Sequence, residues 1–170
     1  TACKSRPLTR AIGAPAFSDV ALLDLAQRWQ AAFPLRLGAT NAYRANHLPK
    51  ADSGMIRVVV CGAHMSGLPL NHQLTDRGGR LLLATRSAAK YRLYALPGAG
   101  VRRPGMVRND DGGAIELEVW QLPAATFGTF VAGIPAPLGI GTIELESGDL
   151  VQGFVCENYA TQGAEDITHH

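Results

Sequence analysis

The residues best suited to chemistry stand in one short stretch, from Ile56 to Leu74. A run of β-forming residues ends there at Gly62, and His64 follows two positions later. A buried strand that ends in a glycine turn leaves backbone N–H groups unpaired, and such groups bind small anions. An imidazole titrates near neutral pH and can give a proton to a bound ligand. The stretch therefore predicts the floor of a pocket, with His64 as the catalytic residue. The alternative is a histidine with a purely structural role.

Arginines are the natural partners for the carboxylates of such a ligand. Arg108 follows a Pro-Gly bend and is the first choice among five candidates, the others being Arg80, Arg86, Arg102 and Arg103. Gly139 stands in a Gly-x-Gly-x-Thr sequence that precedes a strand, and this favours a tight bend near the pocket mouth over a phosphate loop. Paired glutamates are a further option for acid–base chemistry, but alternating glutamates are typical of the solvated face of a strand. We expect Glu116, Glu118, Glu144 and Glu146 on such faces.

Other catalytic devices lack support in the sequence. There is no HExxH or CxxC motif, and His169 and His170 stand at the chain end, so we expect no metal site. There is no GxSxG motif, and Cys61 is expected to be buried in a strand rather than to act as a nucleophile. We expect no cofactor.

Composition limits the class of protein. The 170 residues are 46% hydrophobic and 18% charged, which is typical of a packed globular domain. The net charge is +2, from well-mixed basic and acidic residues, and this disfavours binding to nucleic acid. Three cysteines, an odd number, favour a reducing compartment. No apolar run is long enough to span a membrane and no signal peptide is evident, so we expect a cytoplasmic protein. Because the chain starts at Thr1, we expect a fragment of a longer protein.

The elements that must position the pocket are short. Apolar spacing predicts a helix from about Asp19 to Ala32, then a linker and a domain boundary near residue 54. Beyond it we expect a short helix from Asn71 to about Arg77 and another after Pro123, and a hairpin at 110–113. Strands are predicted at 56–61, 80–86, 91–96, 114–122, 140–146 and 150–157, with a short extended piece at 106–108.

Because most of these strands follow one another as hairpins, the fold class is α+β. It is a small, mainly antiparallel β-barrel or curled sheet with two or three short helices. The predicted units are an N-terminal tail and linker, 1–54, and a domain, 55–170.

The chain resembles the C-terminal domain of allophanate hydrolase. The strings that carry the resemblance run in order across about residues 56–168: VVVCGAHMSGLPLNHQL, YRLYALPG, RPGMVR, AIELEVWQLP, FGTFVAGIPAPLGIGTIEL, GFVCE and DIT. Residues 15–41 resemble the tail of the amidase-signature domain that precedes it in that family. The resemblance implies a γ-glutamyl cyclotransferase-like fold. The glutamate base of cyclotransferases has no counterpart near Gly133–Ala136, which makes cyclotransferase chemistry the weakest hypothesis.

The resemblance implies a role in nitrogen catabolism of urea or cyanuric acid. The amidase domain deaminates allophanate to N-carboxycarbamate, and the C-terminal domain speeds its breakdown to carbamate and carbon dioxide. We expect His64 to supply a proton, and amide groups at Gly62, Ala63 and Met65 with an arginine to bind the dianion. The expected substrate-binding residues are Gly62, Ala63, Met65, Asn71, Gln73, Tyr91, Arg108 and Gly139. A covalently linked amidase domain is the expected partner, and a homo-oligomer stays open. The alternative function is a non-catalytic accessory or oligomerisation module.

Overall fold

The computed structural model describes residues 15, 18, 19, 21–23, 25, 26, 48–98 and 100–169. The chain divides into two compact units, 1–46 and 47–170, which are described separately. In the first unit the described residues from Asp19 to Ala26 are helical, and the Leu22 amide donates to the Ser18 carbonyl at 2.9 Å. The rest of the predicted 19–32 helix lies outside the described residues. The predicted boundary near residue 54 and the amidase origin of the first unit stay predictions.

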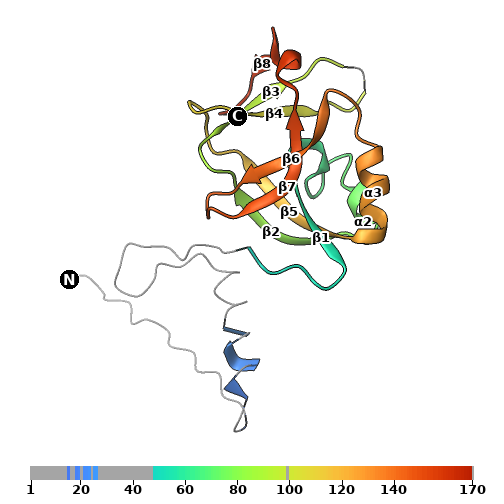
Figure 1. The fold of residues 1–170 in the computed structure, drawn as a ribbon, viewed down its shortest axis with the longest axis vertical. Helices are drawn as coiled ribbons and strands as arrows, with labels where there is room; N and C mark the ends of the chain where they lie inside the picture. Colours follow the sequence, from blue (N-terminus) through green and yellow to red (C-terminus); the bar gives the residue numbers. More distant parts are fainter. Residues whose placement is uncertain are drawn as a thin grey trace, which may run out of the picture. The chain divides into compact units, whose positions relative to one another are not determined.

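The second unit contains two sheets and short helices (Figure 1). The larger sheet has five strands in the order β2-β5-β1-β7-β6, and the smaller has three in the order β4-β3-β8. Only β1 and β7 pair in parallel among these strands. The elements in chain order are β1 (Met55–Val60), η1 (Gly62–His64), α2 (His72–Thr75), β2 (Arg80–Arg86), β3 (Tyr91–Ala95), β4 (Pro104–Arg108), β5 (Glu116–Pro123), α3 (Ala124–Ala132), β6 (Leu138–Glu144), β7 (Leu150–Cys156), η2 (Asn158–Thr161) and β8 (Glu165–Asp166).

The predicted class, a mainly antiparallel α+β fold with a curled sheet, is confirmed. The larger sheet curls until residues beside its two edge strands meet at one isolated bridge, Ser87 to Leu145. The described strands nevertheless form two sheets and no closed barrel. None of the described helices is both long and apolar enough to cross a membrane.

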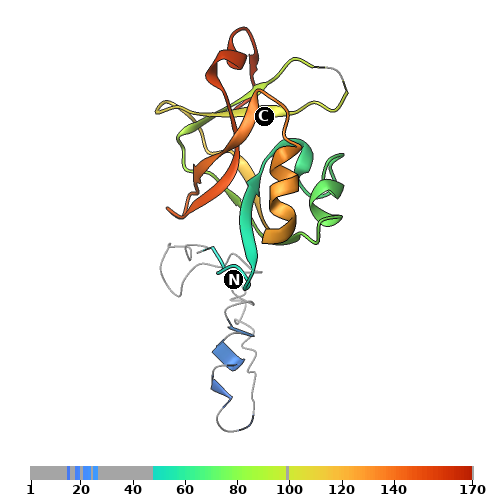
Figure 2. The ribbon, with the colours of Figure 1, turned by 45° about the vertical axis from the view of Figure 1, so that its right-hand side comes forward.

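The core has two parts, one on each face of the five-stranded sheet, because side chains alternate along a strand. On β1, Val59 points into the part shared with the smaller sheet, together with Tyr91 and Met106. Its neighbours Val58 and Val60 point to the other face. Helices α2 and α3 lie side by side over that face (Figure 2). The helix-side core consists of Val58, Val60, Leu74, Trp120, Leu122, Phe130 and Phe154.

One predicted connection is wrong. The Asp-Asp-Gly-Gly sequence at 110–113 does not join a hairpin, since β4 pairs with β3 and β5 pairs with β1 and β2. Gly113 instead forms an isolated bridge with Tyr91. Strand β5 is buried on both faces over most of its length, which agrees with its place between β2 and β1 in the larger sheet. Residues 110–113 do form a turn, but this turn does not determine which strands pair with β5.

Candidate functional site

The turn after β1 is held open by a glycine that no other residue can replace easily. Gly62 has φ +60°, and a Cβ atom at this position would lie 2.4 Å from Cγ of Pro104. Neither the Gly62 nor the Ala63 amide donates a hydrogen bond within the described part of the chain. Both residues line a cavity of about 790 Å³. The Met65 amide is occupied, since it donates to the Gly62 carbonyl at 2.9 Å. Two of the predicted anion-binding amides are therefore available.

His64 is 7% exposed and lies on the helix side of the sheet. Its ring stacks on Phe154, with centroids 4.9 Å apart, and meets the Phe130 ring edge-on at 5.8 Å. Its Nε2 lies 3.0 Å from Oε1 of Gln73. With the amide oxygen facing the ring, this contact needs the tautomer that carries its hydrogen on Nε2, which leaves the Nδ1 lone pair as the acceptor.

The other ring nitrogen, Nδ1, makes no hydrogen bond with the described residues and is not among their fully buried polar atoms without a partner. Burial, the largest effect, lowers the pKa of His64 from its ordinary value. The Gln73 hydrogen bond opposes this shift, while the charges of Arg103 and His72 add to it. Burial thus favours the neutral form of the ring, which is held at Nε2 by Gln73 and has no described partner at Nδ1.

Two side chains fix the loop that carries His64. The Asn71 side-chain amide donates to the His64 carbonyl at 2.8 Å, so Asn71 holds the backbone of the turn and does not cap α2 with its side chain. Glu118 accepts three hydrogen bonds on Oε2, from the Ser66 amide at 2.8 Å, the Ser66 hydroxyl at 3.1 Å and Trp120 Nε1 at 2.9 Å. Glu118 is 7% exposed, so its predicted place on a solvated face is wrong. Its carboxylate anchors the loop to β5.

Three arginines line cavities at the Gly62 turn, namely Arg86, Arg102 and Arg103, and Arg103 is the one of these that also adjoins His64. It lines the 790 Å³ cavity together with Gly62 and Ala63. It also lines a small hollow of about 10 Å³ together with His64, Gln73 and Phe154. Arg103 forms no ion pair with a described residue. An unpaired guanidinium thus stands between two free amides and a buried imidazole.

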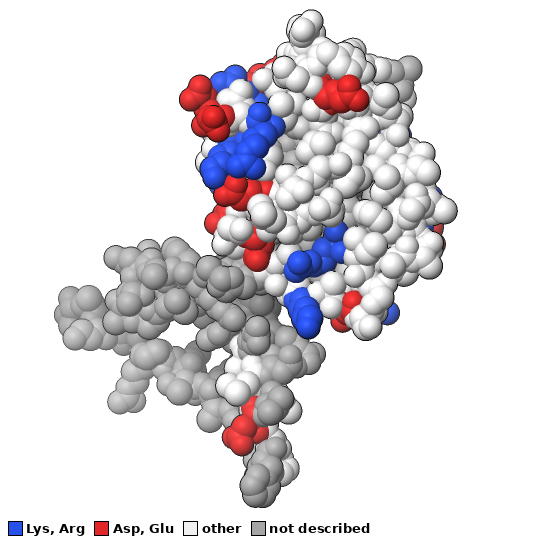
Figure 3. Space-filling model, in the orientation of Figure 1, with Lys and Arg blue, Asp and Glu red and all other residues white. Residues whose placement is uncertain are grey.

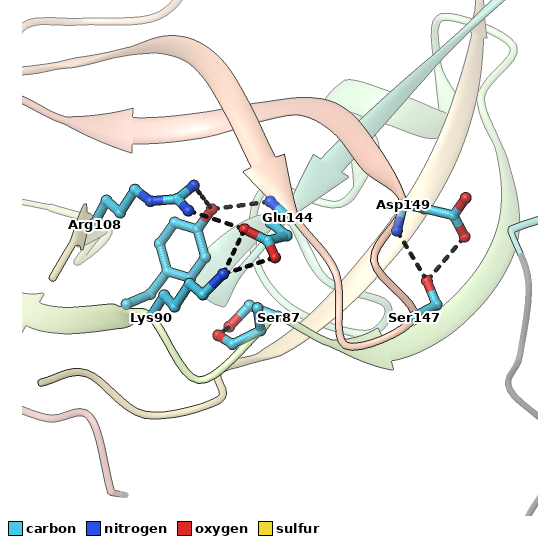
Figure 4. Close-up of polar contacts among 8 residues, drawn as sticks. Ser87, Lys90, Arg108, Glu144, Ser147 and Asp149 are labelled. Carbon is cyan, nitrogen blue, oxygen red and sulfur yellow. Dashed lines mark hydrogen bonds and ion pairs between the residues drawn. The ribbon is translucent and has the colours of Figure 1, made fainter. Parts of the chain in front are cut away.

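The residue chosen from the sequence, Arg108, lies elsewhere. Its NH2 group is 2.9 Å from Oε2 of Glu144, and Lys90 Nζ reaches the same carboxylate at 2.9 and 3.1 Å (Figure 4). These contacts raise the pKa of Arg108 and lower the pKa of Glu144. Tyr91 belongs to the same cluster, because its hydroxyl accepts a hydrogen bond from the Glu144 amide at 2.9 Å. Neither Tyr91 nor Arg108 lines a cavity that contains Gly62 or His64.

Some of the other predicted site residues lie near His64 or the Gly62 turn, and others do not. Gln73 touches His64, and Met65 lines a second cavity, of about 550 Å³, that Gly62 also lines. Gly139, on β6, pairs with Val155 of β7, and it is the preceding residue, Leu138, that lines the hollow beside His64. Cys61 is buried, and burial raises the pKa of its thiol to about 12, in agreement with its expected structural role. The described residues include no cluster of metal-ligating side chains.

The described part of the face in Figure 3 carries no extended basic patch. On the face shown in Figure 3, basic and acidic side chains stand next to one another along one edge, and most of the rest is uncharged. The unit is a small α+β domain in which β1 of the curled sheet ends in a glycine turn. Arg103 lines the cavity at that turn, and His64 lines a separate hollow of about 10 Å³ that Arg103 also borders.

The sequence profile of the allophanate hydrolase C-terminal domain matches residues 56–170. The chain belongs to this family. It is 38% identical to urea amidolyase of Saccharomyces cerevisiae, over 91% of this chain and 9% of the yeast protein. The chain therefore spans about a tenth of the length of the curated relatives that it matches.

Solved structures agree with this assignment. Allophanate hydrolase of Kluyveromyces lactis is 40% identical, with a TM-score of 0.66 over 89% of this chain and 27% of that one. The protein c4763, described as specific to uropathogenic E. coli, is 37% identical, with a TM-score of 0.61 over 67% of this chain and 88% of that one. A γ-glutamyl cyclotransferase is a distant match, at 11% identity and a TM-score of 0.46 over 66% of this chain and 69% of that one.

Proposed function

We propose that this domain converts N-carboxycarbamate to carbamate and carbon dioxide, as one step of an allophanate hydrolase in the catabolism of urea nitrogen. A covalently linked amidase domain would supply the intermediate in the cytoplasm. The observation that carries the proposal is the placement of His64. Its ring is held by Gln73 and Phe154, and Nδ1 of the ring has no described partner. His64 and Arg103 line the same small hollow, of about 10 Å³.

The chemistry needs one proton and no redox partner. N-carboxycarbamate has two carboxylates on one nitrogen. When that nitrogen gains a proton, one C–N bond breaks, its electron pair stays on nitrogen, and the products are carbamate and carbon dioxide. A protonated imidazole is a suitable donor. Arg103 and the Gly62 and Ala63 amides are suited to hold the carboxylates while the nitrogen is protonated.

The lowered pKa of His64 fits this role when the charge of the ligand is included. The free site favours the neutral ring because it is buried beside a cation. A bound dianion reverses the local charge and raises the pKa of the ring, so the proton arrives with the substrate. The acceleration should therefore increase as pH falls toward the pKa of His64 in the complex.

The test is carbon dioxide release from N-carboxycarbamate freshly generated from allophanate by a separate amidase, with and without this 170-residue chain. The wild-type chain should raise the first-order rate above the spontaneous rate, and His64→Asn should lose at least about tenfold of that acceleration. Arg103→Gln should require more substrate for the same rate. The matched control for Arg103→Gln is Arg80→Gln, at an exposed arginine that lines neither the large cavity nor the hollow beside His64.

Equal rates with and without the wild-type chain would refute the catalytic proposal. The remaining function would then be an accessory or oligomerisation module. Loss of amidase stability or of assembly in a full-length protein lacking this domain would support that alternative.

A further inference from the structure

The cavity at the Gly62 turn is much larger than the proposed intermediate requires. Its volume of about 790 Å³ lies in the range of sites that bury drug-sized ligands. N-carboxycarbamate has only a few non-hydrogen atoms and no apolar group. Much of the cavity would stay empty around it.

The additional space is mainly apolar. Leu93, Leu96 and Ile167 line its walls. Leu68 and Val101 line it as well, although they are 45% and 41% exposed, respectively. Large apolar side chains that face solvent around a cavity favour a ligand that covers them.

The cationic groups lie at one end. Arg102 and Arg103 precede Pro104 on β4, close to the free Gly62 amide. The acidic residue of this cavity, Glu165, lies on the opposite edge strand of the small sheet. Ala95 on the central strand β3 pairs with Pro104 of β4 and with Glu165 of β8. A ligand with a single carboxylate at the arginine end suits this arrangement, and a second carboxylate near Glu165 is disfavoured.

We propose that this cavity binds a monocarboxylate that carries an apolar chain, with its carboxylate at Arg103 and the Gly62 and Ala63 amides and its chain against Leu93, Leu96 and Ile167. The proposal shares with the proposed function only the anion-binding end. Such a ligand occupies the place of the intermediate and so inhibits carbon dioxide release competitively.

The experiment is isothermal titration of the 170-residue chain with malonate, butanoate, hexanoate, octanoate and the eight-carbon dicarboxylate suberate. Each methylene that becomes buried tightens binding by up to about fourfold, so octanoate should bind at least about tenfold more tightly than butanoate. Suberate should bind more weakly than octanoate. Malonate, a small dianion in which a methylene replaces the nitrogen of the intermediate, reports the anion-binding end alone.

Two matched pairs of variants locate the ligand. Leu68→Ser should reduce the gain with chain length, whereas Leu81→Ser, at a leucine that is also 45% exposed but lines no cavity with Gly62, should not. Arg103→Gln should weaken binding of every carboxylate, and Arg80→Gln, at an exposed arginine outside these cavities, should leave it unchanged.

The outcomes separate the two proposals. Malonate binding without any gain from butanoate to octanoate would overturn the apolar ligand and leave the proposed function intact. A chain-length gain that both Leu68→Ser and Arg103→Gln leave unchanged would place the ligand elsewhere and also overturn it. If octanoate binds as proposed but the chain does not accelerate carbon dioxide release, the proposed function alone fails.

Discussion

The hydrogen bond between His64 and Gln73 provides a sharp test of how the imidazole is held. Replacing Gln73 by Leu removes the only acceptor that Nε2 has among the described residues. The carbonyl of residue 73 still accepts a hydrogen bond from the Arg77 side chain at 2.9 Å. The Thr75 and Asp76 amides keep their bonds to the carbonyls of residues 71 and 72, so the helical turn itself should persist. The change therefore acts mainly on the ring.

Two effects follow, and their sizes can be stated. A buried N–H donor left without a partner costs about 1–3 kcal/mol, and His64 is 7% exposed, so we expect a loss of this size in the free energy of unfolding at pH 8. The hydrogen bond to Gln73 also holds the pKa of His64 up against burial. Without it, the pKa should fall further, and the alkaline decline in the rate of carbon dioxide release should move to lower pH.

The assays are urea denaturation of the 170-residue chain and the pH–rate profile of carbon dioxide release. Gln73→Glu is the matched variant of opposite sign, because a carboxylate beside the ring favours its charged form and raises its pKa. Its rate profile should move to higher pH. If the two variants shift the profile in the same direction, or neither shifts it, the side chain at position 73 does not control the protonation of His64.

Other substitutions test the supports of the site. Gly62→Ala should cost at least about 2 kcal/mol of unfolding free energy. It should cost more than Gly67→Ala, since Gly67 also has positive φ (+78°) but no atom lies within 4 Å of a Cβ added there. Equal losses would show that the contact with Pro104 is unimportant. Glu118→Leu leaves three donors without an acceptor and should cost at least about 2 kcal/mol in urea denaturation. Tyr91→Phe leaves one amide unpaired and should cost about 1–2 kcal/mol. The pKa of His64 is lowered on folding, so its contribution to the free energy of unfolding should be fully present above the unfolded pKa of about 6.5. It should be lost as pH falls below that value, with a slope of up to about 1.4 kcal/mol per pH unit. His64→Asn should flatten this pH dependence, and an unchanged slope would contradict the prediction.

Much of the fold could be predicted because its signals are local. The apolar run before Gly62 became β1, and the turn around Gly148 joins β6 and β7 as the predicted hairpin. Pro123 stands at the N-cap of α3, at the start of the predicted helix. In each case the periodicity and the breaking residue lie within a few positions of one another, so the sequence contains both parts of the evidence.

The arginine of the site could not be selected in this way. Arg103 directly precedes the five-residue strand β4 and Arg108 is its last residue, so both lie close to Pro104 and Gly105 in the sequence. Their roles differ because of partners distant in the sequence: Glu144 on β6 pairs with one, and the turn after β1 adjoins the other. Glu118 shows the same difficulty, since only the neighbouring Trp120 indicated that its face was covered.

The position of the turn explains why the site needs residues from both layers. β1 lies in the centre of the larger sheet and is buried on both faces, so the chain that leaves it must pass between two layers. At Gly62 the backbone packs against Pro104 of the smaller sheet, and two positions later the His64 ring packs between Phe130 and Phe154 on the helix side. The amides therefore face one layer and the imidazole the other. Arg103 lines both the cavity beside the amides and the small hollow beside the imidazole, so it is the described residue that connects the two sides of the proposed site.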